Sequence, residues 1–275
     1  AGISAHPGID CLAFTGSVAT GRKVGIAGIS RGARINLEMG GKDPFIVCGD
    51  LDSEAVRIAA RGGAWAAYLN AGQVCTSSER FYVMENVYDE YVSAFLEHTK
   101  SLVIGDPLDA KTDLGPMISA TQRGKALAQV EAAVDAGGVL LTGGDDAGFE
   151  TGHYLSPCVL TGVPEDTDLM TEETFGPVAP ILPVSNLEEA IGKANGLDFG
   201  LGANIYTRDL KTAITCLKGV RAGSVWINDP LTDNDAGPFG GFKNSGIGRE
   251  LGTEGLDAFR EAKHVHMDSE IEVKD

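Results

Sequence analysis

Short apolar runs alternate along the chain with longer stretches in which apolar residues recur every three or four positions. The compact runs are typical of buried strands and lie at residues 11–15, 33–39, 139–142, 178–184, 202–207 and 224–228. The longer stretches predict amphipathic helices, because a period of 3.6 residues places their apolar side chains on one face. This alternation predicts an α/β fold in which helices pack on a largely parallel sheet.

Several of the predicted helices carry start and stop signals. Ser53 is a candidate N-cap for a helix that continues until Asn70 and Gly72 provide a stop. Ser119 is expected to cap a later helix that closes at Gly137. Further helices are predicted before residue 29, after residue 86, and from residues 187 and 210.

Composition and charge narrow the classes of function. The 275 residues include 22 Lys+Arg and 39 Asp+Glu, a formal net charge of −17, so most of the surface repels polyanions. We therefore expect neither nucleic acid nor an anionic membrane as a partner. No run approaches the ~20 consecutive apolar residues that span a bilayer, and the N-terminus lacks the pattern of a signal peptide. A soluble, cytoplasmic protein is predicted.

The 43% hydrophobic content is enough for one large or two modest domains. The sequence contains no internal repeat, no charge block and no long Gly/Ser linker. Any domain boundary must therefore lie in a short turn, such as GGKDP at residues 40–44.

The cysteines are widely spread, with no CxxC pair and no His at ligand spacing; they are Cys11, Cys48, Cys75, Cys158 and Cys216. Neither a disulfide framework nor a metal site is predicted. Taken alone, each is most simply a small buried apolar residue. Cys75 has a different context, because the segment LNAGQVCTSSER places it just after the end of a predicted helix. A free thiol is only ~3% ionised at neutral pH, so a reactive Cys75 needs a base or a positive environment.

Glu38 is the candidate base. It ends a predicted strand in the segment NLEMGGK, and the two glycines after it let another backbone or a ligand approach closely. One strand and one helix separate it from Cys75, which in an α/β fold brings two loop ends to the same edge. For an isolated Glu the alternative is an ordinary surface carboxylate.

Two further segments carry candidate binding chemistry. FTGSVATG, residues 14–21, leads from a strand through a Gly-bounded turn into a helix start, where backbone amides can hold an anion. A tight turn without a ligand fits this segment equally well. In EETFGP, residues 172–177, the carboxylates can accept hydrogen bonds from sugar hydroxyls and Phe175 can face a ring. The alternative is a solvated acidic loop with Phe175 anchored in the core.

Together, five segments resemble the ordered motif series of the aldehyde dehydrogenases: FTGS (14–17), LEMGGK (37–42), GQVC (72–75), EETFGP (172–177) and PFGGFKNSGIGREL (238–251). The resemblance spans nearly the whole chain. It implies the remainder of a Rossmann-like nucleotide-binding domain at 1–40, a catalytic domain at 41–250, and a C-terminal return segment with an oligomerisation strand at 251–275. Because residues 261–273 alternate like the strand that bridges subunits in that family, a homo-oligomer is expected.

The resemblance implies oxidation of an aldehyde to a carboxylic acid, with NAD or NADP as the hydride acceptor. Cys75 matches the nucleophile that forms a thiohemiacetal and then a thioester, and its backbone N–H supplies one oxyanion donor. Glu38 matches the general base that activates the hydrolytic water. Glu250 resembles a carboxylate that is proposed to relay protons in some members of the family. Phe239 either shapes the substrate entrance or has a packing role.

The resemblance also implies a set of cofactor contacts. They comprise the turn beside the pyrophosphate (Gly16, Ser17 and Gly21), the backbone that meets the nicotinamide amide (Met39), the ribose-binding carboxylate (Glu173) and its aromatic neighbour (Phe175).

The resemblance begins partway through the family's nucleotide-binding domain. An oxyanion-hole asparagine, a ribose-binding lysine and the first strands of the cofactor sheet have no counterpart in these residues. We therefore expect impaired NAD-dependent turnover by this chain alone. Three explanations are open: a naturally shortened chain, part of a longer protein, and a chain that a partner completes. We favour the first. Two other functions stay open: a cofactor-independent esterase or thioesterase using Cys75 and Glu38, and a non-catalytic assembly module.

Overall fold

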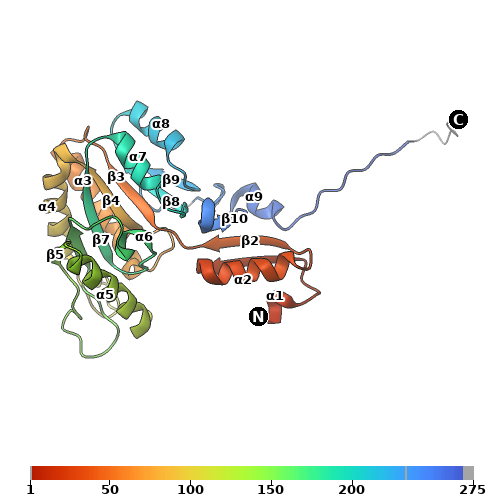
Figure 1. Cartoon of the computed structure of the whole chain (residues 1–275), viewed down its shortest axis with the longest axis horizontal. Coiled ribbons are helices and arrows are strands. Elements are labelled where there is room, and N and C mark those ends of the chain that lie inside the picture. Colours follow the sequence, from red (N-terminus) through yellow and green to blue (C-terminus); the bar gives the residue numbers. More distant parts are fainter. Residues whose placement is uncertain (1, 233, 269–275) are drawn as a thin grey trace.

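The structure, a computed structural model, describes residues 2–232 and 234–268. Across these residues the strands form two sheets, joined by the chain between β2 and β3 (Figure 1). The predicted α/β fold is confirmed. In this part of the chain no helix combines the length and the apolar character needed to cross a membrane.

The smaller sheet has the strand order β1-β2-β10 and draws on both ends of the described chain. β1 and β2 run parallel and are joined by α2, whereas β10 pairs antiparallel with β2 and places Gly246 beside Glu38. α1 precedes this sheet and α9 follows it. The bounds are α1 Gly2–Ala5, β1 Cys11–Gly16, α2 Val18–Ile29, β2 Arg34–Met39, β10 Gly246–Ile247 and α9 Gly252–Asp257.

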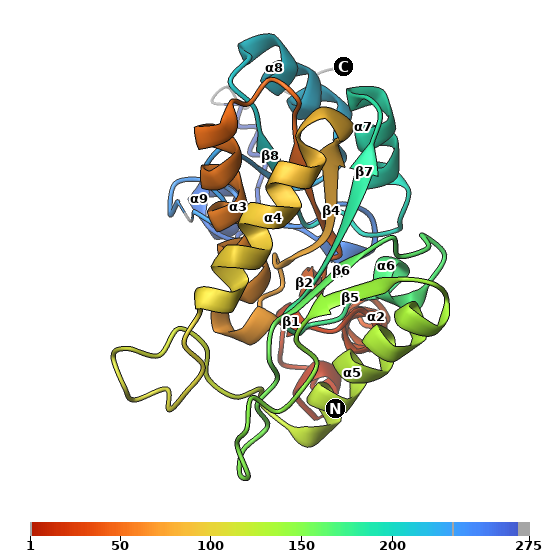
Figure 2. The same ribbon diagram turned by 90° about the vertical axis from the view of Figure 1, so that its left-hand side faces the viewer.

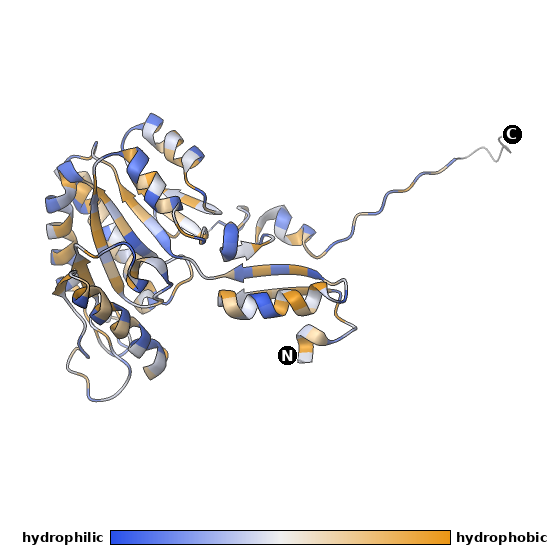
Figure 3. Ribbon diagram, in the orientation of Figure 1, coloured by the Kyte–Doolittle hydropathy of each residue, from blue (hydrophilic) through white to orange (hydrophobic). Residues whose placement is uncertain are grey.

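Side chains of β2 alternate between its two faces, and this alternation decides where Glu38 points. Figure 3 shows apolar and polar residues alternating along the strand. Ile35, Leu37 and Met39 approach the glycines of α2, so they belong to the face that α2 covers. Glu38 therefore lies on the opposite face, away from α2.

The larger sheet has the order β5-β6-β7-β4-β3-β8-β9 and is parallel except for the β5–β6 pair. α3 and α4 pack against each other across one face of it, as Figure 2 shows, while α7 and α8 lie on the other side. The strands are β3 Asp43–Val47, β4 Ser78–Met84, β5 Val139–Thr142, β6 Cys158–Thr161, β7 Val178–Val184, β8 Gly202–Tyr206 and β9 Ser224–Ile227. The helices are α3 Ser53–Tyr68, α4 Glu85–Ser101, α5 Ala120–Asp135, α6 Asp168–Thr171, α7 Leu187–Asn195 and α8 Leu210–Gly219, with short 3-10 turns η1 at Leu69–Gly72 and η2 at Lys243–Ser245.

The core of the larger sheet is aromatic at its centre. Phe45 of β3 lies 5.1 Å from Phe81 of β4 and 5.3 Å from Tyr206 of β8, measured between ring centroids. Phe81 in turn meets Phe95 of α4 edge to face at 5.4 Å. Because helices cover both faces, β3 and β4 are buried along their whole length.

The central strands β3 and β4 are absent from the predicted strands. β3 contains Pro44, and β4 opens with the polar residues Ser78, Glu79 and Arg80, so neither resembles an apolar run. All three of these polar side chains are buried and hydrogen-bonded. The strand pattern was therefore hidden by polar residues that find partners only in the folded protein. β6 and β10 were also missed, because they are short.

One prediction about a helix end needs correction. Ser53 is not the N-cap of α3, because the side chain of Asp52 accepts the hydrogen bond from the N–H of Ala55, whereas Ser119 does cap α5 as predicted. Residues 261–268, the described part of the expected oligomerisation strand, leave the body of the protein as an extended, exposed segment (Figure 1). The strand stays a prediction, because the resemblance implies that it pairs with another subunit. The rest of the predicted segment, 269–273, lies outside the described residues.

Candidate active site

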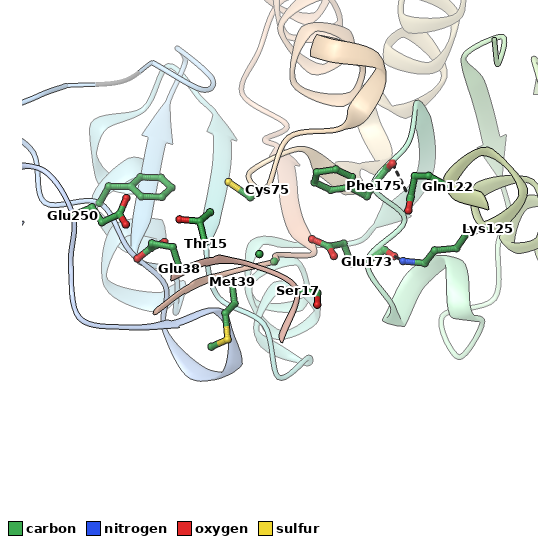
Figure 4. A pocket seen from close by; sticks show the side chains of 13 residues that line it. Thr15, Ser17, Glu38, Met39, Cys75, Gln122, Lys125, Glu173, Phe175 and Glu250 are labelled. Atoms are coloured by element: carbon green, nitrogen blue, oxygen red, sulfur yellow. Dashed lines mark hydrogen bonds between the residues drawn. The ribbon is translucent and has the colours of Figure 1, made fainter. Parts of the chain in front are cut away.

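A cavity of about 580 Å³ lies between the two sheets, at the carboxyl end of β2 (Figure 4). In the view of Figure 4, Cys75, Glu38 and Glu250 lie in one half of the cavity, and the side chains from α5 and from the segment before β7 lie in the other. Its lining residues are Thr15, Gly16, Ser17, Glu38, Met39, Gly40, Cys75, Gln122, Lys125, Glu173, Phe175, Phe239 and Glu250. The two proposed catalytic side chains thus share one cavity with most of the proposed cofactor contacts.

The loop that carries Cys75 is held in an unusual backbone conformation. Asn70 and Ala71, at the end of α3, have φ values of 53° and 56°, a left-handed conformation that is disfavoured for residues with a side chain. Asn70 and Gln73 exchange side-chain-to-backbone hydrogen bonds that stabilise this turn. Gly72 follows with φ of 70°, and a Cβ there would lie 2.2 Å from the backbone of Gly176. The turn therefore needs its glycine to place Cys75 against the cavity.

The thiol of Cys75 is held in its protonated form. Burial raises its pKa from 9.0 to about 11, and the carboxyls of Asp43 and Glu38 add to the rise. Hydrogen bonds from the backbone N–H groups of Cys75 and Thr76 act in the opposite direction. The thiol therefore needs a proton acceptor at the moment of attack.

Glu38 is buried beside this thiol without a fixed partner. Burial raises its pKa from 4.5 to about 8, the negative charge of Glu250 adds to the rise, and Arg249 lowers it. In the described part of the chain neither carboxyl oxygen of Glu38 has a hydrogen-bond partner. A Cβ on Gly240 would lie 2.8 Å from one of these oxygens, so the glycine leaves room for the carboxyl. A near-neutral pKa and free oxygens suit a group that takes and returns protons.

Glu173 and Phe175 line the other half of the cavity. Burial raises the pKa of Glu173 to about 7 and the carboxylate of Glu79 adds to the rise, whereas Lys125 and Lys42 lower it. Gly40 makes room for this carboxyl, because a Cβ there would lie 2.1 Å from its Oε1 atom. Glu173 can accept hydrogen bonds from a hydroxylated ligand, beside the aromatic ring of Phe175.

The cavity is lined by Gly16 at the end of β1, by Ser17 directly after it, and by Met39 at the end of β2. Ser17 caps α2 by accepting a hydrogen bond from the N–H of Thr20, so the positive end of this helix faces the cavity. Gly21 is the exception among the candidate residues, because it does not line the cavity. A Cβ at Gly21 would lie 2.4 Å from the sulfur of Met39, which gives this glycine a packing role beneath Met39.

Sequence reasoning missed three residues of the cavity wall, namely Thr15, Gln122 and Lys125. Thr15 is paired with Glu38 across the β1–β2 ladder. Gln122 and Lys125 lie three positions apart, hence on one face, just after the cap of α5. That spacing was the available signal, but only the fold brings this helix face against residues 173–175. In the residues that the structure describes, no group of three or more His, Cys, Asp or Glu side chains is placed to hold a metal ion.

The sequence is similar to those of known proteins over nearly its whole length. The sequence model of the aldehyde dehydrogenase family matches residues 1–265. The chain is 39% identical over 273 residues to a mitochondrial aldehyde dehydrogenase of Leishmania tarentolae, covering 99% of this chain and 54% of that protein. It is 41% identical over 267 residues to retinal dehydrogenase 2 of Gallus gallus, covering 96% of this chain and 51% of that protein.

Solved structures share the fold of this chain. The NAD-dependent aldehyde dehydrogenase of Sinorhizobium meliloti superposes with a TM-score of 0.93 at 39% identity, over 96% of this chain and 52% of that one. An NAD⁺ complex of an aldehyde dehydrogenase from Bacillus cereus also gives 0.93, at 36% identity, over 98% of this chain and 54% of that one. The chain therefore spans about half the length of the relatives it matches.

Proposed function

The chain belongs to the aldehyde dehydrogenase family, and we propose that it oxidises an aldehyde to a carboxylic acid through covalent intermediates on Cys75, with NAD or NADP as the hydride acceptor. The observation that carries this proposal is the shared cavity, in which Cys75 and Glu38 lie together with Glu173 and Phe175.

The first step is attack of the Cys75 sulfur on the aldehyde carbon. With the pKa of the thiol near 11, its proton must leave as the carbon–sulfur bond forms, and Glu38 is the acceptor, directly or through a water. The carbonyl oxygen gains negative charge, and the backbone N–H of Cys75 is the donor that this chain offers to it. The product of this step is a thiohemiacetal.

The second half of the reaction is hydrolysis of the thioester. Glu38 takes a proton from a water molecule, which attacks the thioester carbon, and the Cys75 sulfur leaves and regains a proton. The unpartnered oxygens of Glu38 are suited to hold that water. Burial makes Glu38 more basic by raising its pKa, and the negative charge of Glu250 adds to this rise.

The residues of the second half of the cavity fit a nicotinamide dinucleotide. Glu173 offers a carboxylate to a ribose hydroxyl, Phe175 offers a ring face, and the start of α2 at Ser17 offers backbone N–H groups to a phosphate. When bound, the oxidised nicotinamide supplies the hydride acceptor that turns the thiohemiacetal into the thioester.

A cofactor-independent esterase is the second candidate function. Acylation of Cys75 by an activated ester and its hydrolysis through Glu38 need only the first half of the cavity, and no hydride acceptor. We also retain three proposals about the organisation of the protein: the division near residue 40, a homo-oligomer, and a location in the cytoplasm.

The test measures NADH formation from a panel of aldehydes and cleavage of p-nitrophenyl acetate by the same preparation. The dehydrogenase proposal predicts both activities and their loss in Cys75→Ser, while Cys11→Ser, a partly buried thiol outside the cavity, retains them. Ester cleavage without NADH formation would favour the esterase. Equal activity in Cys75→Ser and the wild type would exclude Cys75 as the nucleophile of either enzymatic function. A wild type that is inactive in both assays would favour the assembly role.

A further inference from the structure

A buried ion pair lies behind the cavity wall that is formed by residues 173–175. The Nζ atom of Lys42 lies 2.6 Å from Oε2 of Glu79, and their side chains are 0% and 3% exposed. Neither residue lines the cavity. Burying such a pair gives little net stability, because both charges lose their water. Its partners therefore matter more than the attraction between the two charges.

Both oxygens of the Glu79 carboxylate accept hydrogen bonds from the backbone of the cavity wall. The N–H of Thr174 donates to Oε2 at 2.8 Å, and the N–H of Phe175 donates to Oε1 at 2.8 Å. Lys42 adds a bond from Nζ to the hydroxyl of Thr174 at 2.9 Å. One carboxylate thus holds two consecutive amides, with the stronger kind of hydrogen bond that an ionised acceptor gives.

The carbonyl groups of the same segment are held from the opposite side by α5. The amide nitrogen of Gln122 donates to the carbonyl oxygens of Thr174 at 2.9 Å and Phe175 at 3.1 Å. The ammonium of Lys125 donates to the carbonyl oxygen of Glu173. The segment is therefore fixed between β4, which binds its N–H groups, and α5, which binds its carbonyls.

The conformation of Phe175 explains why such fixing is needed. Its φ of 53° is left-handed, which is disfavoured for a bulky residue and persists only when the surroundings enforce it. Without the carboxylate of Glu79, the buried N–H of Thr174 and the partly buried N–H of Phe175 would have no acceptor in this arrangement. The segment would then relax toward a conformation that moves Glu173 and Phe175.

From these contacts we propose that Glu79 is a positioning residue, which fixes Glu173 and Phe175 in place for the dinucleotide without touching it. This inference rests on the proposed function, since it assigns the dinucleotide to that half of the cavity. Lys42 has the lesser part of balancing the charge of Glu79 and binding the hydroxyl of Thr174. Its own backbone is fixed by Arg80, whose Nε donates to the carbonyl oxygen of Lys42 at 2.8 Å.

The experiment compares Glu79→Gln with Lys42→Met in the full chain. Both variants break the ion pair, but only Glu79→Gln replaces the carboxylate that accepts the two backbone N–H groups. In hydrogen–deuterium exchange, we expect the peptide over residues 172–177 to exchange about tenfold faster or more in Glu79→Gln, with a smaller change in Lys42→Met. Peptides from α4 and β7 act as the internal reference. Equal acceleration in both variants, or none in Glu79→Gln, would overturn the proposal.

The functional measurement is the affinity for NAD⁺, determined by isothermal titration calorimetry. Glu79→Gln should weaken NAD⁺ binding about tenfold more than it slows cleavage of p-nitrophenyl acetate, because Cys75 and Glu38 lie in the other half of the cavity. The charge of Glu79 raises the pKa of Glu173, so Glu79→Gln favours the ionised form of Glu173. Because an ionised Glu173 is the better acceptor for a ribose hydroxyl, weaker NAD⁺ binding in this variant would indicate that Glu173 has lost its position. An ester rate that falls as far as NAD⁺ affinity would overturn the inference.

Two outcomes separate this inference from the proposed function. If the wild type does not bind NAD⁺, the dehydrogenase proposal fails, while the exchange data still decide whether Glu79 fixes the segment. If Glu79→Gln does not fold, the double variant Lys42→Met/Glu79→Gln is used instead, because it leaves no unpaired buried charge. Hydrogen exchange and NAD⁺ binding are then measured on the double variant. Unchanged exchange at residues 172–177 in that double variant would overturn the inference.

Discussion

Replacing Glu250 by Gln removes a negative charge that raises the pKa of Glu38. The exchange conserves shape, and the backbone of Glu250 stays anchored by its two hydrogen bonds with Phe239, at 2.7 and 2.8 Å. Glu38 itself is not altered. The variant therefore tests whether Glu38 is the titrating base and whether the charges around it set its pKa.

The magnitude follows from the titration of Glu38, whose pKa is about 8. One neighbouring charge at a partly buried site is worth on the order of one pKa unit. Lowering the pKa of Glu38 by that amount raises its ionised fraction at pH 7 from ~9% to ~50%. A step that requires ionised Glu38 then runs about fivefold faster at pH 7. Above both pKa values the variant and the wild type converge.

The assay is the rate of p-nitrophenyl acetate hydrolysis as a function of pH. The wild-type rate should rise through a midpoint near pH 8, as the carboxyl of Glu38 ionises. The midpoint should fall in Glu250→Gln and rise in Arg249→Met, because Arg249 lowers the pKa of Glu38. These two neighbours thus act as matched opposites. Midpoints that move in the same direction would indicate a distorted loop, and an unmoved midpoint in Glu250→Gln would refute the assignment of Glu38 as the base.

Three further predictions concern the same cavity. Alkylation by iodoacetamide should modify Cys75 faster as pH rises toward 11, and peptide mass spectrometry should find no other cavity residue labelled. Folding raises the pKa of Glu38 from its ordinary value of 4.5 to about 8, so the contribution of this carboxyl to stability falls as pH rises between these two values. Melting curves should therefore show Glu38→Gln gaining stability relative to the wild type across that pH window. A gain that shrinks with pH would contradict this sign. Gly40→Ala should weaken NAD⁺ binding about tenfold, because the added Cβ falls 2.1 Å from Oε1 of Glu173. The control is Gly124→Ala, at an exposed helix position where an added Cβ meets no atom within 4 Å. It should add about 0.5–1 kcal/mol of stability and leave NAD⁺ binding unchanged.

The sequence alone was informative where residue type and neighbouring residues decide the outcome. The α/β alternation, the cap at Ser119 and the candidates Cys75 and Glu38 follow from periodicity, local turn chemistry and an ordered set of motifs. The prediction of Gly21 as a ligand contact needed the structure for its interpretation, because its environment is the sulfur of Met39. The C-terminal oligomerisation strand, expected at residues 261–273, stays a prediction.

Tertiary structure decided what depends on partners far apart in the sequence. β4 begins with Ser78, Glu79 and Arg80, which look like a polar loop in the sequence. In the folded protein their side chains are hydrogen-bonded to the residue before β3, to β8, to α7 and to the segment before β7. The near-neutral pKa of Glu38 also depends on burial and on Glu250, which lies more than two hundred positions along the chain. Local sequence determines which element forms and which chemical groups it carries. The solvent exposure and electrostatic neighbours of those groups, and hence their reactivity, depend on packing between distant segments.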